Sequence, residues 1–173
     1  MQSKRAIVIT GPVGSGKSST AKALAESLEY ADISCAFIDM DTLRWFHPTP
    51  SDDPFGEAVG YRHVRMMAET YAERGIPTLI LADVIETVAS RQKLAGAIPG
   101  YQLLVVRLDV PMEILKQRLR LRETQRQQAW HFNRAQELQE IMVRNRIGDV
   151  VIPVGTEGVE TVAQRIGQEL GLL

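Results

Sequence analysis

Residues 11–18 read GPVGSGKS, which fits the Walker A pattern GxxxxGK followed by serine or threonine. Glycines in such a loop let successive backbone N–H groups point at the oxygens of a triphosphate, and the lysine reaches the β- and γ-phosphates. The hydroxyl after the lysine is placed to bind Mg²⁺, so we expect Lys17 to be catalytic and Ser18 to be a metal ligand. The nucleotide contacts predicted in this loop are Gly11, Val13, Gly14, Ser15, Gly16, Lys17, Ser18 and Ser19.

The segments on either side of this loop have the composition of a strand and a helix. Residues 6–9 form an apolar run rich in β-branched side chains, as expected for a strand that is buried on both faces. Residues 18–28 carry alanine and leucine at helical spacing. The first turn of that helix adds free N–H groups and the positive end of a dipole to the phosphate site. Strand, loop and helix in this order favour a nucleotide site over a chance glycine-rich turn.

A carboxylate follows another apolar run of the chain. Residues 78–82 read TLILA and are followed by Asp83, which is the pattern of a Walker B acid. If this strand lies beside the first one, the carboxylate approaches Ser18 and the Mg²⁺ ion. We therefore predict Asp83 as a second metal ligand, and a plain helix cap is the alternative.

Two further acids come after the apolar run 34–38. Asp39 and Asp41 are two residues apart, so in an extended segment both carboxylates face one pocket. We predict that both bind the substrate and that Asp41 is catalytic, accepting the proton of an incoming hydroxyl while Asp39 supports the metal or the acceptor. The choice of base between the two stays open. Because aspartate is common in turns, an acidic turn is the alternative.

Arginines are predicted on both sides of the transferred phosphoryl group. Arg118 and Arg122 are one helical turn apart and share a face, so they can fold over the phosphates as a lid and neutralise developing charge. We predict both as catalytic residues. Arg44, Arg62 and Arg65 are predicted to hold an anionic acceptor through paired hydrogen bonds. For each of these arginines, a solvated charge on an exposed helix is the alternative.

Strands alternate with helices along the whole chain. Beyond the runs already described, strands are predicted at 101–108 and 150–152, and helices at 57–74, 84–95, from 111 onward, at 133–146 and near the C-terminus. Residues 42–54 hold three prolines and are predicted as a loop. Alternation of this kind favours parallel strands with right-handed crossovers. We therefore predict a three-layer α/β fold of the P-loop NTPase type, a single domain over residues 1–173, with ligands at the carboxyl ends of the strands.

The composition is that of a folded protein in water. Of the 173 residues, 45% are hydrophobic and 24% are charged, and no apolar run approaches the ~18 residues of a membrane span. The N-terminus leads straight into the first strand, so we expect a cytoplasmic protein without a membrane partner. The net charge of −1 gives no broad attraction to nucleic acid, which we do not expect as a partner. We expect a monomer or a homodimer that binds a small-molecule acceptor.

Taken together, these segments resemble the P-loop kinases of the nucleoside-monophosphate-kinase-like superfamily over essentially the whole chain. GPVGSGKSS, DMDTLR, LILAD and VRLDVPMEILKQRLRLRE occur in that family's order. The resemblance implies a five-stranded parallel sheet in the order 2-3-1-4-5, which sets the strand before Asp83 beside the first strand. It also implies an arginine-bearing lid around residues 116–132 and contact of the adenine with the loop at 154–156, including Thr156.

The acceptor is less well defined by resemblance. DMDTLR is similar to the DGDxxR stretch of adenylylsulfate kinases, with Met40 in place of the usual glycine, and His131-Phe132 is similar to gluconate kinases. The leading hypothesis is a kinase that uses ATP and Mg²⁺ and transfers the γ-phosphoryl group to a hydroxyl or phosphate of a small molecule. The alternatives are a polynucleotide or antibiotic kinase and a nucleotide-dependent regulatory ATPase. Against the last, the chain carries no NKxD or LSGGQ motif.

Overall fold

The computed structural model describes residues 4–122 and 124–173 and contains a five-stranded sheet. The strands are β1 (Arg5–Thr10), β2 (Ala36–Asp39), β3 (Thr78–Ala82), β4 (Gln102–Asp109) and β5 (Val150–Pro153). They lie in the order β2-β3-β1-β4-β5, and every neighbouring pair is parallel. The predicted α/β fold and the strand order 2-3-1-4-5 are confirmed.

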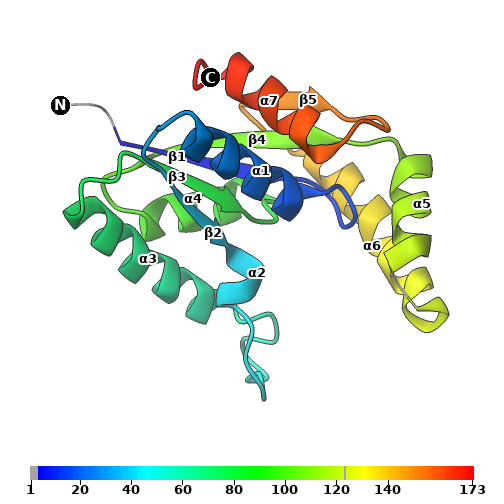
Figure 1. Ribbon diagram of the computed structural model, residues 1–173. Coiled ribbons are helices and arrows are strands. Elements are labelled where there is room, and N and C mark those ends of the chain that lie inside the picture. The colour runs from blue at the N-terminus through cyan, green and yellow to red at the C-terminus, as the bar shows by residue number, and fades with distance from the viewer. Residues whose placement is uncertain (1–3, 123) are drawn as a thin grey trace.

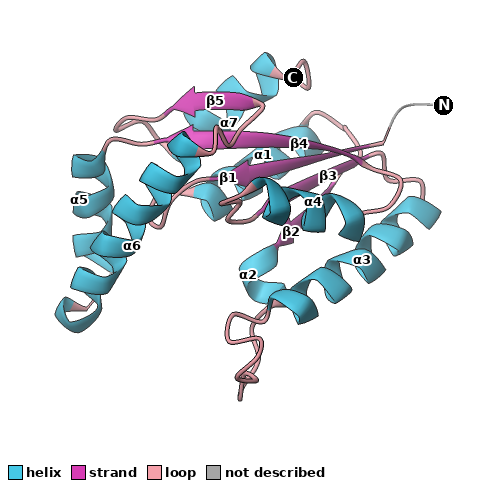
Figure 2. Ribbon diagram, turned by 180° about the vertical axis from the view of Figure 1, so that it is seen from behind, coloured by secondary structure: helices cyan, strands magenta, loops and turns pink. Residues whose placement is uncertain are grey.

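Helices cover both faces of this sheet and complete the three layers that the sequence predicts. They are α1 (Lys17–Tyr30), α2 (Met40–Leu43), α3 (Glu57–Glu73), α4 (Val88–Ala97), α5 (Met112–Arg122), α6 (Gln125–Arg144) and α7 (Val159–Glu169). α1 and α7 pack on one face, and α3, α4 and α6 lie on the other, as Figure 1 and Figure 2 show from opposite sides. Within the described residues, no helix combines the length and the hydrophobicity of a membrane span.

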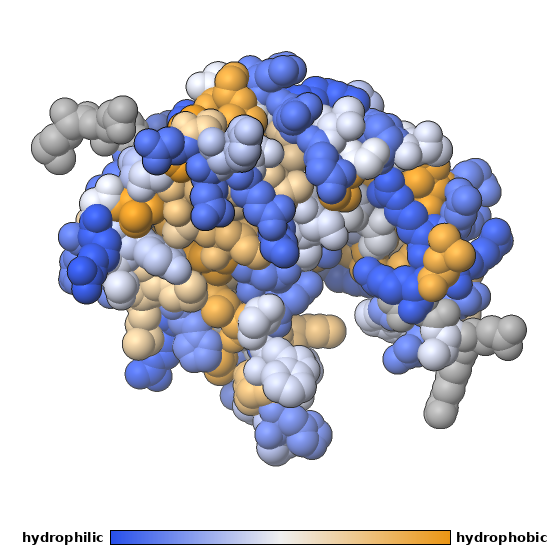
Figure 3. Space-filling view, viewed as in Figure 1, coloured by the Kyte–Doolittle hydropathy of each residue, from blue (hydrophilic) through white to orange (hydrophobic). Residues whose placement is uncertain are grey.

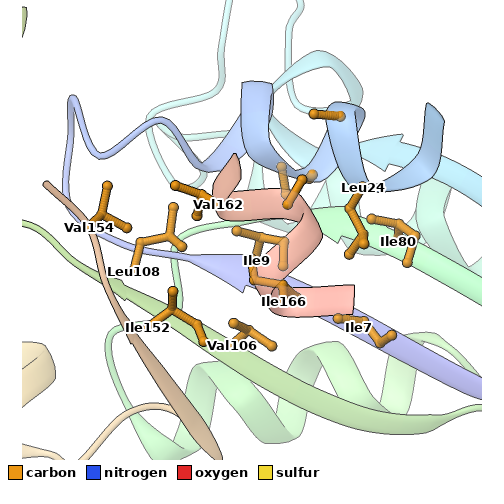
Figure 4. Close-up of a cluster of buried hydrophobic side chains, with 14 of the residues drawn as sticks. Ile7, Ile9, Leu24, Ile80, Val106, Leu108, Ile152, Val154, Val162 and Ile166 are labelled. Atoms are coloured by element: carbon orange, nitrogen blue, oxygen red, sulfur yellow. The ribbon is translucent and has the colours of Figure 1, made fainter. Parts of the chain in front are cut away.

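The sheet divides the apolar core into two clusters. On the face of α1 and α7, Ile9 of β1 meets Leu24 and Ile166 (Figure 4). On the opposite face, Val8 of β1 packs in the same cluster as Val64 of α3. Successive residues of β1 point to opposite faces, and both faces are buried because helices cover them. This packing fixes the end of β1, from which the phosphate-binding loop starts.

Two helices begin at residues other than those predicted. α4 begins at Val88, later than predicted, because Thr87 caps it: the Thr87 side-chain oxygen accepts a hydrogen bond from the backbone N–H of Ser90 at 3.0 Å. α6 begins at Gln125, earlier than predicted. Because α6 begins in the segment predicted as a lid and continues into the core, α5 and α6 form a hairpin, which we call the lid hairpin.

The segment after β2 turns into a helix at once. β2 ends at Asp39, and the Asp39 carboxylate accepts a hydrogen bond from the backbone N–H of Asp41 at 3.0 Å. This contact caps the short helix α2, in which Met40 is fully buried and Asp41 is exposed. The expectation that Asp39 and Asp41 lie in one extended segment is therefore wrong, and the predicted loop begins after α2.

Two parts of the chain project beyond the carboxyl ends of the strands, with a cleft between them. One is α2 with the loop 44–56, at the bottom of Figure 1, and the other is the hairpin of α5 and α6 at the right. Figure 3 shows the surface hollowed between these two parts. The loop 11–18 follows the central strand β1, so it lies between them at the base of the cleft.

Candidate active site

The loop 11–18 and the start of α1 have the backbone of an anion site. Gly14 and Gly16 adopt positive φ angles of 83° and 87°, which residues with side chains rarely adopt. Gly16 is the N-cap of α1, no side chain of the described residues caps this helix end, and its first turn carries no acidic residue. The N–H groups of the first turn are therefore available to an external anion, which the helix dipole also favours.

The inner side of this loop is closely packed. A Cβ atom on Gly11 would lie 2.7 Å from Ser15 Oγ, and one on Gly14 would lie 3.1 Å from Leu119 Cγ. The backbone N–H of Ser15 donates to the carbonyl oxygen of Pro12 at 3.1 Å. Ser15 is only 1% exposed, and its hydroxyl has no hydrogen-bond partner among the described residues. Because a buried polar group without a partner is costly, this hydroxyl fits an oxygen of a bound phosphate.

Three further residues that are predicted to contact the nucleotide follow one another in the chain. Lys17 and Ser18 are the first two residues of α1 and are partly buried, whereas Ser19 is exposed. Val13 packs against the apolar core, so its side chain anchors the loop and its backbone remains the candidate for a nucleotide contact. The structure thus brings the loop residues together at one helix end.

Arg118 of α5 connects the lid hairpin to the phosphate-binding loop. Its Nη1 donates to the carbonyl oxygen of Ser15, and its Nη2 donates to the carbonyl oxygen of Gly155, each at 3.1 Å. The guanidinium therefore bridges the loop 11–18 and the loop after β5, where Thr156 is exposed. A guanidinium has five N–H donors, so this bridge leaves Arg118 further donors for a ligand.

The second predicted lid arginine lies nearer the tip of the hairpin. Arg122 is the last residue of α5 and is exposed. Arg120 lies with its guanidinium carbon 5.9 Å from the ring centre of Phe132, a contact that joins α5 to α6. The segment 116–132, which the sequence predicts as a lid, includes the end of α5 and the start of α6. Arg118 therefore lies at the phosphate-binding loop, and Arg122 lies one helical turn further out.

Arg44 and Asp83 form a buried ion pair with each other. Arg44 Nη2 lies 2.9 Å from Asp83 Oδ1 and donates to Oδ2 at 3.1 Å. The backbone N–H of Val84 also donates to Oδ1, at 2.8 Å. The Asp83 side chain is fully buried, and that of Arg44 is 14% exposed. Both carboxylate oxygens are thus engaged, while the backbone N–H of Asp83 donates to Ile9 and holds the residue beside β1.

Burial dominates the electrostatics of this pair. It raises the pKa of Asp83 to about 6 from an ordinary value of 3.8, and Arg44 and the N–H of Val84 act in the opposite direction. The loss of hydration therefore outweighs the attraction of the guanidinium. The negative charge of Asp41 contributes to the raised pKa of Asp83, which puts Asp41 within electrostatic range of the pair.

Helix α3 holds Arg44 from the other side. The guanidinium carbon of Arg44 lies 5.6 Å from the ring centre of Tyr61, and a Cβ atom on Gly60 would lie 2.6 Å from Arg44 Cγ. Burial, together with the charge of Asp83, raises the pKa of Tyr61 to about 12, so its phenol stays protonated. The sequence predicted neither Gly60 nor Tyr61 as a site residue. A glycine inside a helical pattern, which often marks a close approach, is the signal that could have shown them.

His63 of α3 is a second neighbour of this site that the sequence did not single out. Its Nδ1 lies 3.0 Å from the carbonyl oxygen of Leu43, at the end of α2. Because a carbonyl only accepts, Nδ1 carries the proton of this hydrogen bond. Nothing in the sequence pattern distinguishes His63 from an ordinary exposed helix residue, because the contact joins two elements.

The two arginines of α3 do not join Arg44. Arg65 Nη2 donates to the carbonyl oxygen of Gly96 at 2.7 Å, so its side chain is turned toward α4. Arg62 is exposed and follows the buried Gly60 by two positions, about 200° around the helix, so it lies on the face away from Arg44. The arrangement of three arginines around one acceptor is therefore not formed in this structure.

The protein groups at the start of α1 fit a Mg²⁺ ion only together with a bound nucleotide. Across residues 4–122 and 124–173, no three side chains of His, Cys, Asp or Glu form a group that could hold a metal ion. Mg²⁺ usually takes only one or two protein oxygens and completes its shell with phosphate oxygens and water. The Ser18 hydroxyl, beside the free N–H groups of α1, is compatible with this mode of binding.

One protein family matches most of this chain. The family model AAA_33, described as an AAA domain, matches residues 7–146. No curated protein matches the chain.

Several solved structures share the fold. A tunicamycin resistance protein from Deinococcus radiodurans is 22% identical with a TM-score of 0.68, and the match covers 98% of this chain and 97% of that one. A sugar kinase from a Janibacter species is 20% identical with a TM-score of 0.66, covering 98% and 95%. An APS kinase from Mycobacterium tuberculosis, solved with AMPPNP and APS, is 19% identical with a TM-score of 0.66, covering 99% of each chain. The predicted resemblance to P-loop kinases of the nucleoside-monophosphate-kinase-like type is confirmed.

Proposed function

Because the chain belongs to the AAA_33 family of AAA domains, we propose that it is a kinase that transfers the γ-phosphoryl group of ATP to a hydroxyl or phosphate group of a small molecule. The observation that carries this proposal is the uncapped start of α1 behind the loop 11–18, with Lys17 and Ser18 in the first turn. The kinases that share the fold support it. A second wall of the cleft, with Asp41 and the Arg44–Asp83 pair, offers a place for the acceptor.

The donor nucleotide is proposed to bind on the side of α1 and α5. The backbone N–H groups of the loop, the hydroxyl of Ser15 and the Lys17 ammonium hold the phosphates. The adenine lies near Thr156, in the loop that Arg118 ties to the phosphate site. Arg118 is therefore both a candidate phosphate contact and the residue that sets the distance between the two ends of the nucleotide.

The Ser18 hydroxyl would hold a Mg²⁺ ion beside the nucleotide phosphates, and the ion would supply positive charge there. Asp83 remains the candidate for a further contact. Both of its oxygens already accept hydrogen bonds, so such a contact would pass through water or follow release of Arg44. Asp39, which caps α2, is another carboxylate at this end of the sheet.

The transfer step is proposed to run between the two walls of the cleft. Asp41 accepts the proton of the acceptor hydroxyl, whose oxygen forms a bond to the γ-phosphorus. The bond between that phosphorus and the β–γ bridging oxygen breaks, and the electron pair leaves with ADP. Lys17 and Arg122 neutralise the charge that spreads over the γ-phosphoryl oxygens. Asp39 and the paired Arg44 orient the acceptor.

A Lys17→Ala variant tests the donor site. We expect acceptor-dependent ATP turnover to fall by at least about 100-fold, because a charge that stabilises the transition state is lost. The melting temperature should stay within about 2 °C of the wild-type value, because Lys17 is not part of the core. Lys22→Ala, an exposed lysine on the same helix, is the matched control. Turnover that survives in Lys17→Ala would rule out this loop as the catalytic centre.

The dependence of turnover on an acceptor separates a kinase from a regulatory ATPase. A kinase should consume ATP faster when its acceptor is added and should yield one phosphorylated product per ADP. A panel of alcohols, sugars and nucleotides that never raises turnover above basal hydrolysis would favour the regulatory ATPase.

A further inference from the structure

We infer that Glu157 and Arg165 are positioning residues for the donor nucleotide, which hold the loop 153–158 in the form that receives the base. This inference rests on the proposed kinase function and adds two residues to its donor site. Both residues act through the backbone of the loop, so neither has to touch the nucleotide. The resemblance to P-loop kinases pointed to the loop at 154–156 but not to the side chains that hold it.

The carboxylate of Glu157 folds back onto its own loop. Its Oε2 accepts the backbone N–H of Gly155 at 2.8 Å, and its Oε1 accepts a hydrogen bond from Arg165 Nη2 at 2.9 Å. A Cβ atom on Gly155 would lie 2.8 Å from Glu157 Oε2, so the glycine leaves the space that the carboxylate occupies. A hydrogen bond from its own backbone N–H, together with those from Arg165 and Gly155, lowers the pKa of Glu157.

Arg165 of α7 holds the same loop at its first residue. Its Nη1 donates to the carbonyl oxygen of Pro153 at 2.7 Å, while its Nη2 binds Glu157. One guanidinium therefore joins the end of β5 to a residue four positions later. The helix behind it is packed in the core, because Ile166 is fully buried. Since the planar guanidinium directs its donors in a fixed fork, it sets the shape of the loop between these two contacts.

Arg118 joins the same loop to the phosphate-binding loop. The carbonyl oxygen of Gly155 accepts from Arg118 Nη2, and Arg118 Nη1 donates to the carbonyl oxygen of Ser15. Gly155 is thus held through its N–H by Glu157 and through its carbonyl by Arg118. Figure 1 shows this loop extending from β5 and α7 toward α5. An unbroken series of hydrogen bonds therefore runs from α7 through the loop to the phosphate site.

Beyond the buried Val154, the loop lies at the surface of the molecule. Thr156 and Gly158 are exposed, and no side chain of the described residues caps α7 at Gly158. If a loop becomes ordered only when its ligand binds, the entropy cost weakens binding, whereas a loop that is held beforehand avoids this cost. We therefore expect Glu157 and Arg165 to strengthen nucleotide binding through the base and not through the phosphates.

Two ligands that differ in the base test this inference with the full-length protein. AMPPNP carries a base and a phosphate chain, whereas inorganic tripolyphosphate carries phosphates alone. Isothermal titration in the presence of Mg²⁺ measures the Kd of each ligand. In Glu157→Ala and in Arg165→Ala, we expect the Kd for AMPPNP to rise by about tenfold and that for tripolyphosphate to stay within about twofold. Glu157→Gln should have a smaller effect, because its amide oxygen can still accept the N–H of Gly155.

The opposite charges of the two residues separate positioning from simple electrostatics. Glu157→Ala removes a negative charge and Arg165→Ala removes a positive one, so an electrostatic effect alone would change the Kd of an anionic ligand in opposite directions. Loss of the loop position weakens AMPPNP binding in both variants. The double variant should bind AMPPNP no more than about twofold worse than the weaker single variant, because the two residues act as one unit.

Glu160→Ala and Gln164→Ala are the matched controls, because both residues are exposed on the same helix as Arg165. They should keep both Kd values within about twofold of the wild type. The melting temperature without ligand should stay within about 3 °C of the wild-type value in every variant, as expected for changes at the surface.

The outcomes separate this inference from the function on which it rests. An unchanged Kd for AMPPNP in both Glu157→Ala and Arg165→Ala would overturn the inference, as would shifts in opposite directions or an equal loss for AMPPNP and tripolyphosphate. If Lys17→Ala weakens both ligands in those cases, the proposed donor site stands without this pair. If Lys17→Ala binds both ligands as the wild type does, the proposed donor site fails, and this inference fails with it.

Discussion

Among single residues, the buried pair of Arg44 and Asp83 is the feature that most constrains function. Because burial raises the pKa of Asp83 to about 6 despite the neighbouring guanidinium, keeping this carboxylate ionised costs folding free energy at neutral pH. A buried ion pair of this kind fixes geometry more than it stabilises the fold. The group whose geometry it fixes is Arg44, at the edge of the acceptor wall.

Substitution of Asp83 by asparagine should expose this cost. The pKa is near 3.8 in the unfolded chain and about 6 in the fold, so between these values the folded protein binds more protons. The contribution of Asp83 to the free energy of unfolding of the wild-type protein is therefore present at low pH and is lost as the pH rises through about 6. Relative to Asp83→Asn, the free energy of unfolding of the wild type should fall by about 2 kcal/mol between pH 4 and pH 7.

Urea unfolding at a series of pH values measures this difference. Asp52→Asn, an exposed acid in the loop 44–56, is the control and should show no such trend relative to wild type. A difference between wild type and Asp83→Asn that stays constant, or that moves in favour of the wild type as the pH rises, would mean that Arg44 compensates the burial of Asp83 fully.

At the scale of elements, the link between α5 and the phosphate-binding loop is a single side chain. Arg118→Ala should raise KM for ATP by about 10- to 100-fold, because two hydrogen bonds from a charged donor to backbone carbonyls are lost. The KM for the acceptor should change less. This difference would show that the variant disturbs the two loops that hold the nucleotide and not the whole protein. Arg118→Lys should recover only part of the loss, because an ammonium cannot span both carbonyls with a planar fork.

Arg120→Ala is the matched control for this prediction, since Arg120 lies on the same helix and contacts Phe132 of α6 instead. Steady-state kinetics at varied ATP concentration measure the KM for ATP in both variants. An Arg118→Ala enzyme with an unchanged KM for ATP would show that the two loops keep their spacing without this bridge.

Most elements of the fold could be predicted from the sequence because their signals are periodic. The buried strands read as apolar runs, and α3 and α7 have clear helical spacing, so their existence and order follow from pattern alone. The start of α4 and the change from β2 to α2 could not, because each depends on one capping hydrogen bond, at Thr87 and at Asp39.

The residues of the candidate site also form two groups, those that a local sequence pattern predicts and those that only the packing brings together. The loop 11–18 is local in sequence, so its residues could be named before the structure was known. The pairing of Arg44 with Asp83 joins residues 39 positions apart, and no spacing rule reports it. The directions of Arg62 and Arg65 depend on which face α3 turns to the sheet, and this is set by the packing of Gly60 and Val64. Residue types therefore suggested three arginines around one acceptor, an arrangement that this packing does not form.

At the scale of the whole molecule, the nucleotide is expected to join elements from both ends of the chain. The loop 11–18, α5 and the segment after β5 would all contact it. Saturating AMPPNP with Mg²⁺ at about 100 times its Kd should therefore stabilise the fold by about 2.7 kcal/mol, which corresponds to a rise of about 5–10 °C in melting temperature for a protein of this size.

A thermal shift assay with and without AMPPNP and Mg²⁺ measures this effect. The Lys17→Ala protein should show a much smaller shift at the same ligand concentration, and Lys22→Ala should match the wild type. Equal shifts in wild type and Lys17→Ala would indicate that the nucleotide binds elsewhere on the molecule.

The placement of the two tryptophans has a practical consequence. The chain contains no others, and Trp45 belongs to the loop 44–56 while Trp130 belongs to α6 of the lid hairpin. All of the indole emission of this protein therefore originates from these two segments. With one tryptophan changed to phenylalanine, the fluorescence of the remaining indole reports on one segment, so the loop 44–56 and the lid hairpin can be followed separately without an attached dye.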